Sequence, residues 1–266
     1  MSTAIQALAD RIKICILNQG VWNSVRNHKA ETRQEQSRHG TQRIKSVDIV
    51  LAEDENLKQA LTIKGKIYTE HRRLTMPSPC DGMRIVPLSR EFEHSSTLGG
   101  LIYEFNKSVK KFIDNWDDVV ITAKNELNGL FDASMFPTQE ELQRRFYNNI
   151  RYMSCPHDGD WAGWLDETMK VGRLELQQRI IDAARNLADV CSKDGRVFES
   201  TLDKLQDICE LSGDFNLMDD PIISKASKEL SIITREYNVE DLRKNDAIKR
   251  DVANRTNQIL ATLKLS

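Results

Sequence analysis

The longest regular pattern of apolar positions lies between residues 98 and 130. Apolar side chains recur there mostly at alternating steps of four and three, with charged residues between them. The members of this seam are Leu98, Ile102, Phe105, Val109, Phe112, Trp116, Val119, Ala123, Leu127 and Leu130. Such a heptad seam predicts one helix of roughly 40 residues, about 60 Å long, which needs a long antiparallel partner.

A second apolar face with helical spacing runs through residues 161–212. It begins at Leu165 and continues to Leu211, and Asp194-Gly195 is expected to break or kink it. We therefore expect residues 98–266 to contain a long antiparallel, coiled-coil-like hairpin. Local signals predict shorter helices at a T-x-x-E capping box (Thr138–Glu141), at Asp220-Pro221 and at Asn238.

The N-terminal third carries weaker signals. Within residues 2–22, helical spacing gives way to the strand-like alternation of Ile12, Ile14 and Ile16, so this stretch favours a short helix followed by a short strand and leaves strand or helix open at 12–16. Residues 83–87 are a second strand candidate that could pair with it. The predicted fold is mostly α: an elongated helical bundle with the long hairpin and at most a small β element in the N-terminal third. We expect two regions, an N-terminal α(+β) region at 1–97 and a helical region at 98–266.

Residues 23–46 contain almost no apolar side chain, so they cannot bury a face of their own. Their six cations outnumber the carboxylates Glu31 and Glu35; they are Arg26, Lys29, Arg33, Arg38, Arg43 and Lys45. We interpret the segment as a polar, basic, mobile loop. Its cations would contact nucleic-acid phosphates or an acidic protein surface, and a merely solvated loop is the alternative.

An acidic stripe lies near the end of the second apolar face. Glu199, Asp203 and Asp207 follow one another at i, i+4 spacing, which places three like charges on one helix face. Like charges at this spacing destabilise an isolated helix, so cations of the same chain or of a partner should lie opposite them. We treat the three residues as candidate partner-binding residues that could mimic phosphate, with a solvated face as the alternative.

The amino-acid composition argues against several classes of protein. The chain has 266 residues and a net charge of -2, so its overall charge selects neither nucleic acid nor a membrane. Only 12 glycines and 6 prolines argue against an all-β fold. Five cysteines never form CxxC, and no apolar run approaches the roughly 18 residues of a membrane span. The N-terminal residues do not have the pattern of a signal peptide. We therefore expect a cytoplasmic protein with reduced cysteines.

Signals of catalysis are weak. Gly99-Gly100 lacks the flanking residues of a phosphate-binding loop, and we interpret it as a turn or a helix start. The stretch Cys155-Pro-His-Asp-Gly-Asp160 offers metal-ligating side chains, but its proline and glycine favour a turn. His94 follows Glu91 and Glu93 and is expected on the surface. The sequence therefore predicts no catalytic residue, no metal and no cofactor, and a protein that is not an enzyme.

Four motifs spread along the chain form a further pattern. They are Trp22-Asn-Ser-Val-Arg-Asn-His-Lys29, Phe136-Pro-Thr-Gln-Glu-Glu-Leu142 followed by Phe146, Asn216-Leu-Met-Asp-Asp-Pro221, and Leu242-Arg-Lys-Asn-Asp246 with Arg250. Together they resemble a phage and prophage family of unknown function, whose genes often lie beside those of MoxR-type AAA+ ATPases and von Willebrand A-domain proteins. The chain departs from it at Val25-Arg26-Asn27, where that family often has G-R-K. The resemblance implies a phage origin and a protein-binding role, with no catalytic residue to transfer.

These observations predict a non-enzymatic, helical phage protein that acts in the cytoplasm of the infected cell. Its expected partner is a protein, either an AAA+ ATPase that it serves as adaptor or a host protein. Two alternatives stay open: an inhibitor of a host defence or host enzyme, and a nucleic-acid-binding protein that uses residues 26–45. The seam at 98–130 would also allow two copies to associate.

Overall fold

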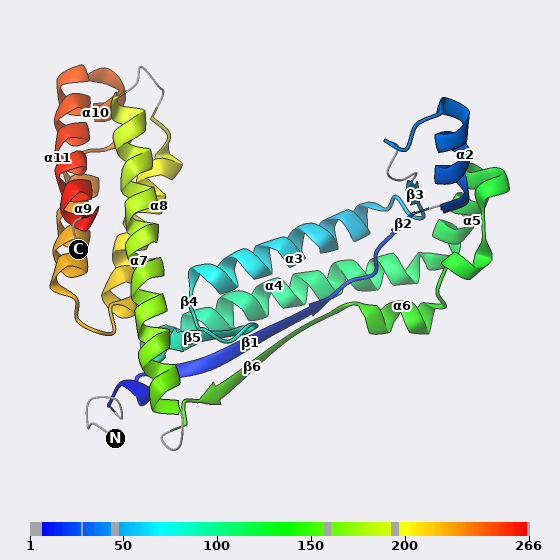
Figure 1. Ribbon diagram of the computed structural model, residues 1–266, viewed down its shortest axis with the longest axis horizontal. Coiled ribbons are helices and arrows are strands. Elements are labelled where there is room, and N and C mark those ends of the chain that lie inside the picture. Colours follow the sequence, from blue (N-terminus) through cyan, green and yellow to red (C-terminus); the bar gives the residue numbers. More distant parts are fainter. Residues whose placement is uncertain (1–6, 28, 44–47, 157–160, 193–196, 265–266) are drawn as a thin grey trace. The chain divides into compact units, whose positions relative to one another are not determined.

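The computed structural model describes residues 7–27, 29–43, 48–156, 161–192 and 197–264 (Figure 1). The chain groups into two compact units. Unit 1 takes residues 1–16, 72–94 and 151–266, and unit 2 takes residues 17–71 and 95–150. The expected division of the chain into regions 1–97 and 98–266 stays a prediction.

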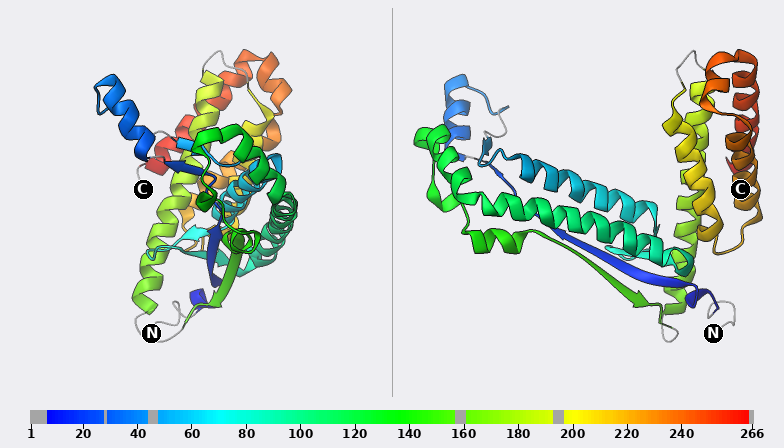
Figure 2. Two further views of the ribbon diagram at one scale, coloured as in Figure 1. Left: turned by 90° about the vertical axis from the view of Figure 1, so that its right-hand side faces the viewer. Right: turned by 180° about the vertical axis from the view of Figure 1, so that it is seen from behind.

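The C-terminal part of unit 1 is helical. Its helices are α7 (Trp161–Ser192), α8 (Glu199–Phe215), α9 (Pro221–Glu236), α10 (Val239–Lys244) and α11 (Asp246–Lys264). Helix α7 packs against α8 and α11, and α9 packs against the same two helices (Figure 2). Their apolar faces form one buried cluster, which includes Leu176, Ile180, Leu205, Leu230 and Val252.

The predicted helix starts in this region are confirmed. Asp220 accepts hydrogen bonds from the backbone N–H groups of Ile222 and Ile223, and Pro221 occupies the first turn of α9. Asn238 and Asp241 form a capping box at the start of α10. These motifs are predictable because their hydrogen bonds join residues at most three apart in sequence.

Four strands form an antiparallel sheet in the order β4-β5-β1-β6. They are β1 (Ile12–Gly20), β4 (Met76–Pro77), β5 (Met83–Pro87) and β6 (Tyr147–Ser154). The predicted pairing of residues 12–16 with 83–87 is confirmed: Ile14 lies opposite Ile85, and both side chains are buried. The expectation of at most a small β element is wrong, because β1 continues to Gly20, β6 adds eight residues, and a second sheet exists.

Unit 2 is built around two helices that lie side by side, α3 (Glu55–Arg73) and α4 (Leu88–Asp114) (Figures 1 and 2). Its other elements are β2 (Val25–Asn27), α2 (Lys29–His39), β3 (Asp48–Val50), α5 (Trp116–Leu127), the 3-10 helices η1 (Asn128–Leu130) and η2 (Ala133–Met135), and α6 (Gln139–Arg145). Thr138 and Glu141 form the predicted capping box of α6. The core of the unit combines aliphatic and aromatic side chains, including Trp22, Ile63, Ile67, Phe105 and Phe112.

The predicted coiled-coil-like hairpin is wrong. The seam does not form one helix, because α4 ends at Asp114 and α5 runs only from Trp116 to Leu127. Most of its apolar residues are buried in or packed against the cluster of unit 2, with Ile63 and Ile67 of α3, although Leu130 is exposed. The apolar face of α7 belongs to the cluster of unit 1. A heptad pattern indicates that an apolar stripe is covered, but it does not specify by what. Here the shorter α3, Trp22 and Phe146 cover it.

The prediction that residues 23–46 form a basic loop is also wrong for much of this segment. Residues 29–39 form helix α2 between the strands β2 and β3, which pair with Val25 opposite Val50. Glutamate, glutamine and arginine are good helix formers, and Glu35 forms an ion pair with Arg38 and lies 3.3 Å from Nε2 of His39 one turn later. Local propensity therefore favours a helix even though α2 has no apolar face.

Candidate functional site

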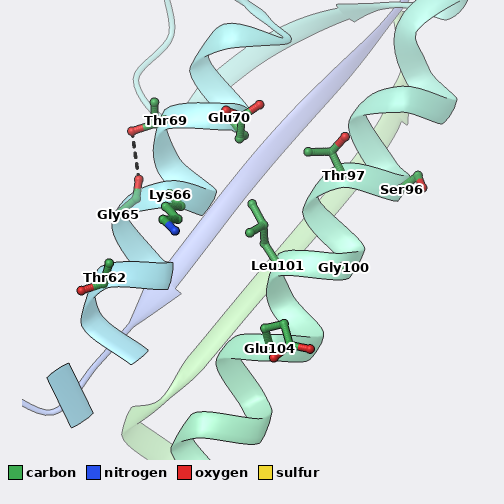
Figure 3. A pocket seen from close by; sticks show the side chains of 10 residues that line it. All are labelled: Thr62, Gly65, Lys66, Thr69, Glu70, Ser96, Thr97, Gly100, Leu101 and Glu104. Carbon is green, nitrogen blue, oxygen red and sulfur yellow. Dashed lines mark hydrogen bonds between the residues drawn. The ribbon is translucent and has the colours of Figure 1, made fainter. Parts of the chain in front are cut away.

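A groove of about 910 Å³ lies between α3 and α4, entirely within unit 2 (Figure 3). We call it the α3–α4 groove. Its walls are Thr62, Gly65, Lys66, Thr69 and Glu70 from α3, and Ser96, Thr97, Gly100, Leu101 and Glu104 from α4. Most of these side chains are small or short, so the groove is wide and its walls are low.

The sequence produces this groove because each helix buries only one face. On α3, Leu57, Ile63 and Ile67 point into the core, and on α4 the seam residues Leu98 and Phe105 do the same. The groove residues lie on other faces of both helices. The Thr69 hydroxyl donates to the carbonyl oxygen of Gly65 at 3.0 Å, so its hydrogen bond is made within α3.

Two glycines in the groove walls have no explanation in the packing of the chain itself. Gly65 and Gly100 are exposed and lie in helix interiors, where glycine costs about 1 kcal/mol relative to alanine. A Cβ atom added at either position would meet no described atom within 4 Å beyond its chain neighbours and the backbone of its own helix turns, and the same holds at Gly99. The missing side chains therefore leave room for a group from outside the unit to approach the backbone closely.

Charges of both signs line the groove. Lys66 and Glu70 lie on α3, and Glu104 lies on α4 (Figure 3). Glu104 forms a loose, exposed ion pair with Lys107 at 3.9 Å. A molecule bound in the groove would therefore meet charges of both signs from the α3 wall and the carboxylate of Glu104 from the α4 wall.

Sequence reasoning missed this groove. It interpreted Gly99-Gly100 as a turn or a helix start, and that interpretation is wrong, because both residues lie near the middle of α4. The signal that could have found the site is a glycine on each of two adjacent helices. Only the tertiary structure shows that Gly65 and Gly100 line the same groove, whereas Gly99 does not.

The predicted basic residues lie elsewhere in unit 2. Lys29, Arg33 and Arg38 are exposed on α2, and Arg43 is exposed after it. Arg26 lies on β2, where its guanidinium donates to the carbonyl oxygen of Val25. Lys45 lies outside the described residues. None of these residues lines the α3–α4 groove, and their role in binding a partner stays a prediction.

The acidic stripe lies on α8 in unit 1, and cations of the same chain form ion pairs with part of this helix. Arg73 donates to Asp207 at 2.6 Å, and Arg90 donates to Asp214 at the same distance. Glu199 and Asp203 are exposed. The stripe offers a partner fewer uncompensated carboxylates than its sequence suggests, and the inhibitor hypothesis stays a prediction.

His94 is fully buried, so its expected place on the surface is wrong. Its Nδ1 atom lies 2.7 Å from the Tyr152 hydroxyl, and a ring nitrogen lies within 4.8 Å of the Cys15 sulfur. Burial lowers the pKa of His94 to about 4 and raises the pKa of Cys15 to about 12. Both groups are therefore neutral at pH 7, and Cys15 is not the activated thiolate of a cysteine nucleophile. The sequence also offered metal-ligating side chains in the stretch 155–160. Residues 157–160 of that stretch lie outside the described residues.

Comparison with known proteins finds no match. No protein-family model, curated protein or solved structure is similar to this chain. Among the described residues, no helix is long and apolar enough to cross a membrane.

Proposed function

We propose that this chain is a protein-interaction protein that docks helices of another protein molecule against its α3–α4 groove. The observation that carries the proposal is the pair of exposed glycines, Gly65 and Gly100, on opposite walls of the groove. Each one costs helix stability, and no packing within the described residues requires the absence of a side chain there. Glycine at such positions lets a second backbone come closer than any other residue would.

The shape of the groove favours a helix over a small ligand. Lining residues recur at steps of three and four because each wall is one face of a helix, so the groove runs lengthwise along α3 and α4 and offers an elongated surface to a helix. Small-molecule sites usually bury most of the ligand surface. Here Thr62, Thr69 and Ser96 are exposed, so a small ligand would remain largely in solvent.

The family resemblance supports one version of this proposal. In that version the chain acts in a phage-infected cell as an adaptor for an AAA+ ATPase, and the docked helix belongs to that ATPase or to a protein delivered to it. The motifs at residues 22–29, 136–142 and 216–221 are the support for this version.

Filling the groove should abolish docking without unfolding the chain. A photoreactive amino acid at Ser96, inside the groove, should crosslink the partner in cells, and mass spectrometry would identify the product. Adding Gly100→Leu should remove the crosslink, whereas Gly99→Leu, on the same helix outside the groove, should retain it. Thermal unfolding should show both variants at least as stable as the parent, because leucine favours helix by up to about 1 kcal/mol over glycine.

Two possible results with the leucine variants would contradict the proposal. If Gly99→Leu and Gly100→Leu reduce the crosslink equally, the groove is not the docking site. If Gly100→Leu lowers the unfolding temperature, the glycine serves the fold of the unit instead of a partner.

A second candidate function is nucleic-acid binding by α2, and the exposed cations of this helix favour it. Lys29 and Arg33 lie one turn apart on the same helix face, where they would contact neighbouring phosphates. The double variant Lys29→Ala, Arg33→Ala should weaken binding to a short duplex DNA. It should also reduce the slope of log affinity against log salt by about 0.9 for each lost phosphate contact.

Fluorescence anisotropy between about 50 and about 200 mM salt measures this slope. Lys124→Ala, which removes an exposed cation of α5 in the same unit, is the matched control. Absence of binding at the lowest salt would eliminate this candidate.

A further inference from the structure

We propose that unit 1 binds a small phosphate monoester that carries hydroxyl groups, such as a sugar phosphate or a nucleoside monophosphate, in a cavity between α8 and α9. The cavity has a volume of about 450 Å³, within the range of about 300–1,000 Å³ that small-molecule sites have. It lies within unit 1 and shares no residue with the α3–α4 groove. A ligand here is therefore independent of the docking proposed for the groove.

Hydrogen bonds between side chains of the two helices hold the floor of the cavity in place. The hydroxyl groups of Ser212 on α8 and Ser227 on α9 lie 2.6 Å apart, and both residues are buried. One turn further along the chain, the Asn216 amide donates to the Ser224 hydroxyl oxygen at 2.9 Å. Because that oxygen accepts from Asn216, the proton of the Ser224 hydroxyl remains available to a ligand.

Two cations on the α9 wall have no partner in the part of the chain that the structure describes. Lys228 and Arg235 are exposed, and neither side chain forms a hydrogen bond or an ion pair there. Ser231 lies three residues after Lys228 and four before Arg235, so the three side chains share one face of the helix. Two flexible cations and a hydroxyl group can therefore surround one anionic group.

The charge of the α9 wall favours a phosphate monoester over a carboxylate. A phosphate monoester carries about −1.5 to −2 charges at pH 7, which matches two cations, whereas a carboxylate carries a single charge. Glu236, the carboxylate next to Arg235, does not supply this charge, because it pairs with Arg255 at 2.7 Å. The planar guanidinium of Arg235 also suits two oxygens of one phosphoryl group. The phosphoryl group would therefore lie over Ser231, between the two cations.

The other end of the cavity has the opposite charge. Among the residues that line the cavity in the described part of the chain, Asp219 is the only carboxylate. It precedes the start of α9 at Pro221, and Arg235 lies about 20 Å further along the helix axis. Asp219 accepts hydrogen bonds, and Ser224 beside it donates one. Hydroxyl groups suit this end of the cavity, whereas a second phosphate does not.

Gly213 leaves the α8 wall open. It is exposed within α8, next to Ser212 in sequence, and it lines the cavity. A Cβ atom there would meet no described atom within 4 Å beyond its chain neighbours and the backbone of its own helix turns. A large side chain at this position would therefore occupy space that the body of the ligand needs.

Isothermal titration calorimetry of the full chain tests the site with ribose 5-phosphate and adenosine 5′-monophosphate. The parent should bind at least one of them with a Kd below about 1 mM, should bind inorganic phosphate more weakly, and should not bind ribose. Lys228→Gln and Arg235→Gln should each weaken binding about tenfold or more, because each removes a charged donor. Lys225→Gln is the matched control, since its exposed, loose ion pair with Glu229 lies on α9 outside the cavity.

Thermal unfolding should be the same for the parent, Lys228→Gln and Arg235→Gln, because neither cation has a partner in the described fold. Gly213→Phe should weaken the binding of the esters more than that of inorganic phosphate. Three results would overturn the proposal: neither ester binds at about 10 mM, ribose binds as tightly as its phosphate, or Lys225→Gln weakens binding as much as Lys228→Gln does.

Discussion

At the scale of single residues, burial decides the chemistry more than neighbours in sequence do. His94 follows two glutamates, which would raise its pKa if all three side chains shared the solvent. Instead its ring is buried beside Tyr152, and the cost of placing a charge there lowers its pKa to about 4. The same burial raises the pKa of Tyr152 to about 12. The pair therefore shares a hydrogen bond between neutral groups.

The His94 pKa predicts a loss of stability in mild acid. The unfolded chain binds a proton at His94 near pH 6.5, whereas the folded chain does so only near pH 4. The stability contributed by the neutral ring is present above pH 6.5 and is lost as the pH falls through this window. This contribution is on the order of 3 kcal/mol. Urea unfolding of the parent and of His94→Gln at several pH values measures it.

The variant should show a shallower fall of unfolding free energy between about pH 6.5 and about pH 4. Carboxylates contribute equally to both proteins, so the difference isolates His94. Parallel curves for parent and variant would mean that His94 titrates normally.

At the scale of elements, helix starts and helix ends are decided differently. The starts of α6, α9 and α10 use side chains at most three residues away, whereas the end of α3 uses a side chain from α7. Arg179 donates to the carbonyl oxygens of Arg72 at 2.8 Å and of Arg73 and Thr75 at 3.1 Å. A cation at this end also complements the helix dipole. Glu175, one turn earlier on α7, forms an ion pair with Arg179.

Removing this contact should destabilise the end of α3. Arg179→Ala should lower the unfolding free energy by about 2–4 kcal/mol, because the part-buried carbonyl groups of Arg73 and Thr75 lose a charged donor. Arg179→Lys keeps the charge but lacks the planar fork, so it should recover less than half of that loss. Arg185→Ala is the control on the same helix, since its exposed ion pair with Asp182 contributes little. Equal unfolding free energies for Arg179→Ala and Arg185→Ala would refute the assigned role.

At the scale of the whole molecule, two apolar clusters define two units, and each cluster draws on segments far apart in sequence. The cluster of unit 1 joins Ile12, Ile85 and Leu176, and that of unit 2 joins Trp22, Ile67 and Phe146. Each unit therefore closes only when distant segments meet. No periodicity within one segment encodes such a partnership, and this is why the hairpin of residues 98–130 with 161–212 was a wrong expectation.

The sequence by itself determined the predominance of helix and the caps of α6, α9 and α10, and it indicated strand candidates at residues 12–16 and 83–87. Each of these follows from hydrogen bonds or alternation within a few residues. The tertiary structure alone decided what covers the seam, the burial of His94, and the meeting of Gly65 and Gly100 in one groove. These features depend on which surfaces come into contact in three dimensions. The contacts that form are the ones that give the best packing of the whole unit, which no single segment specifies.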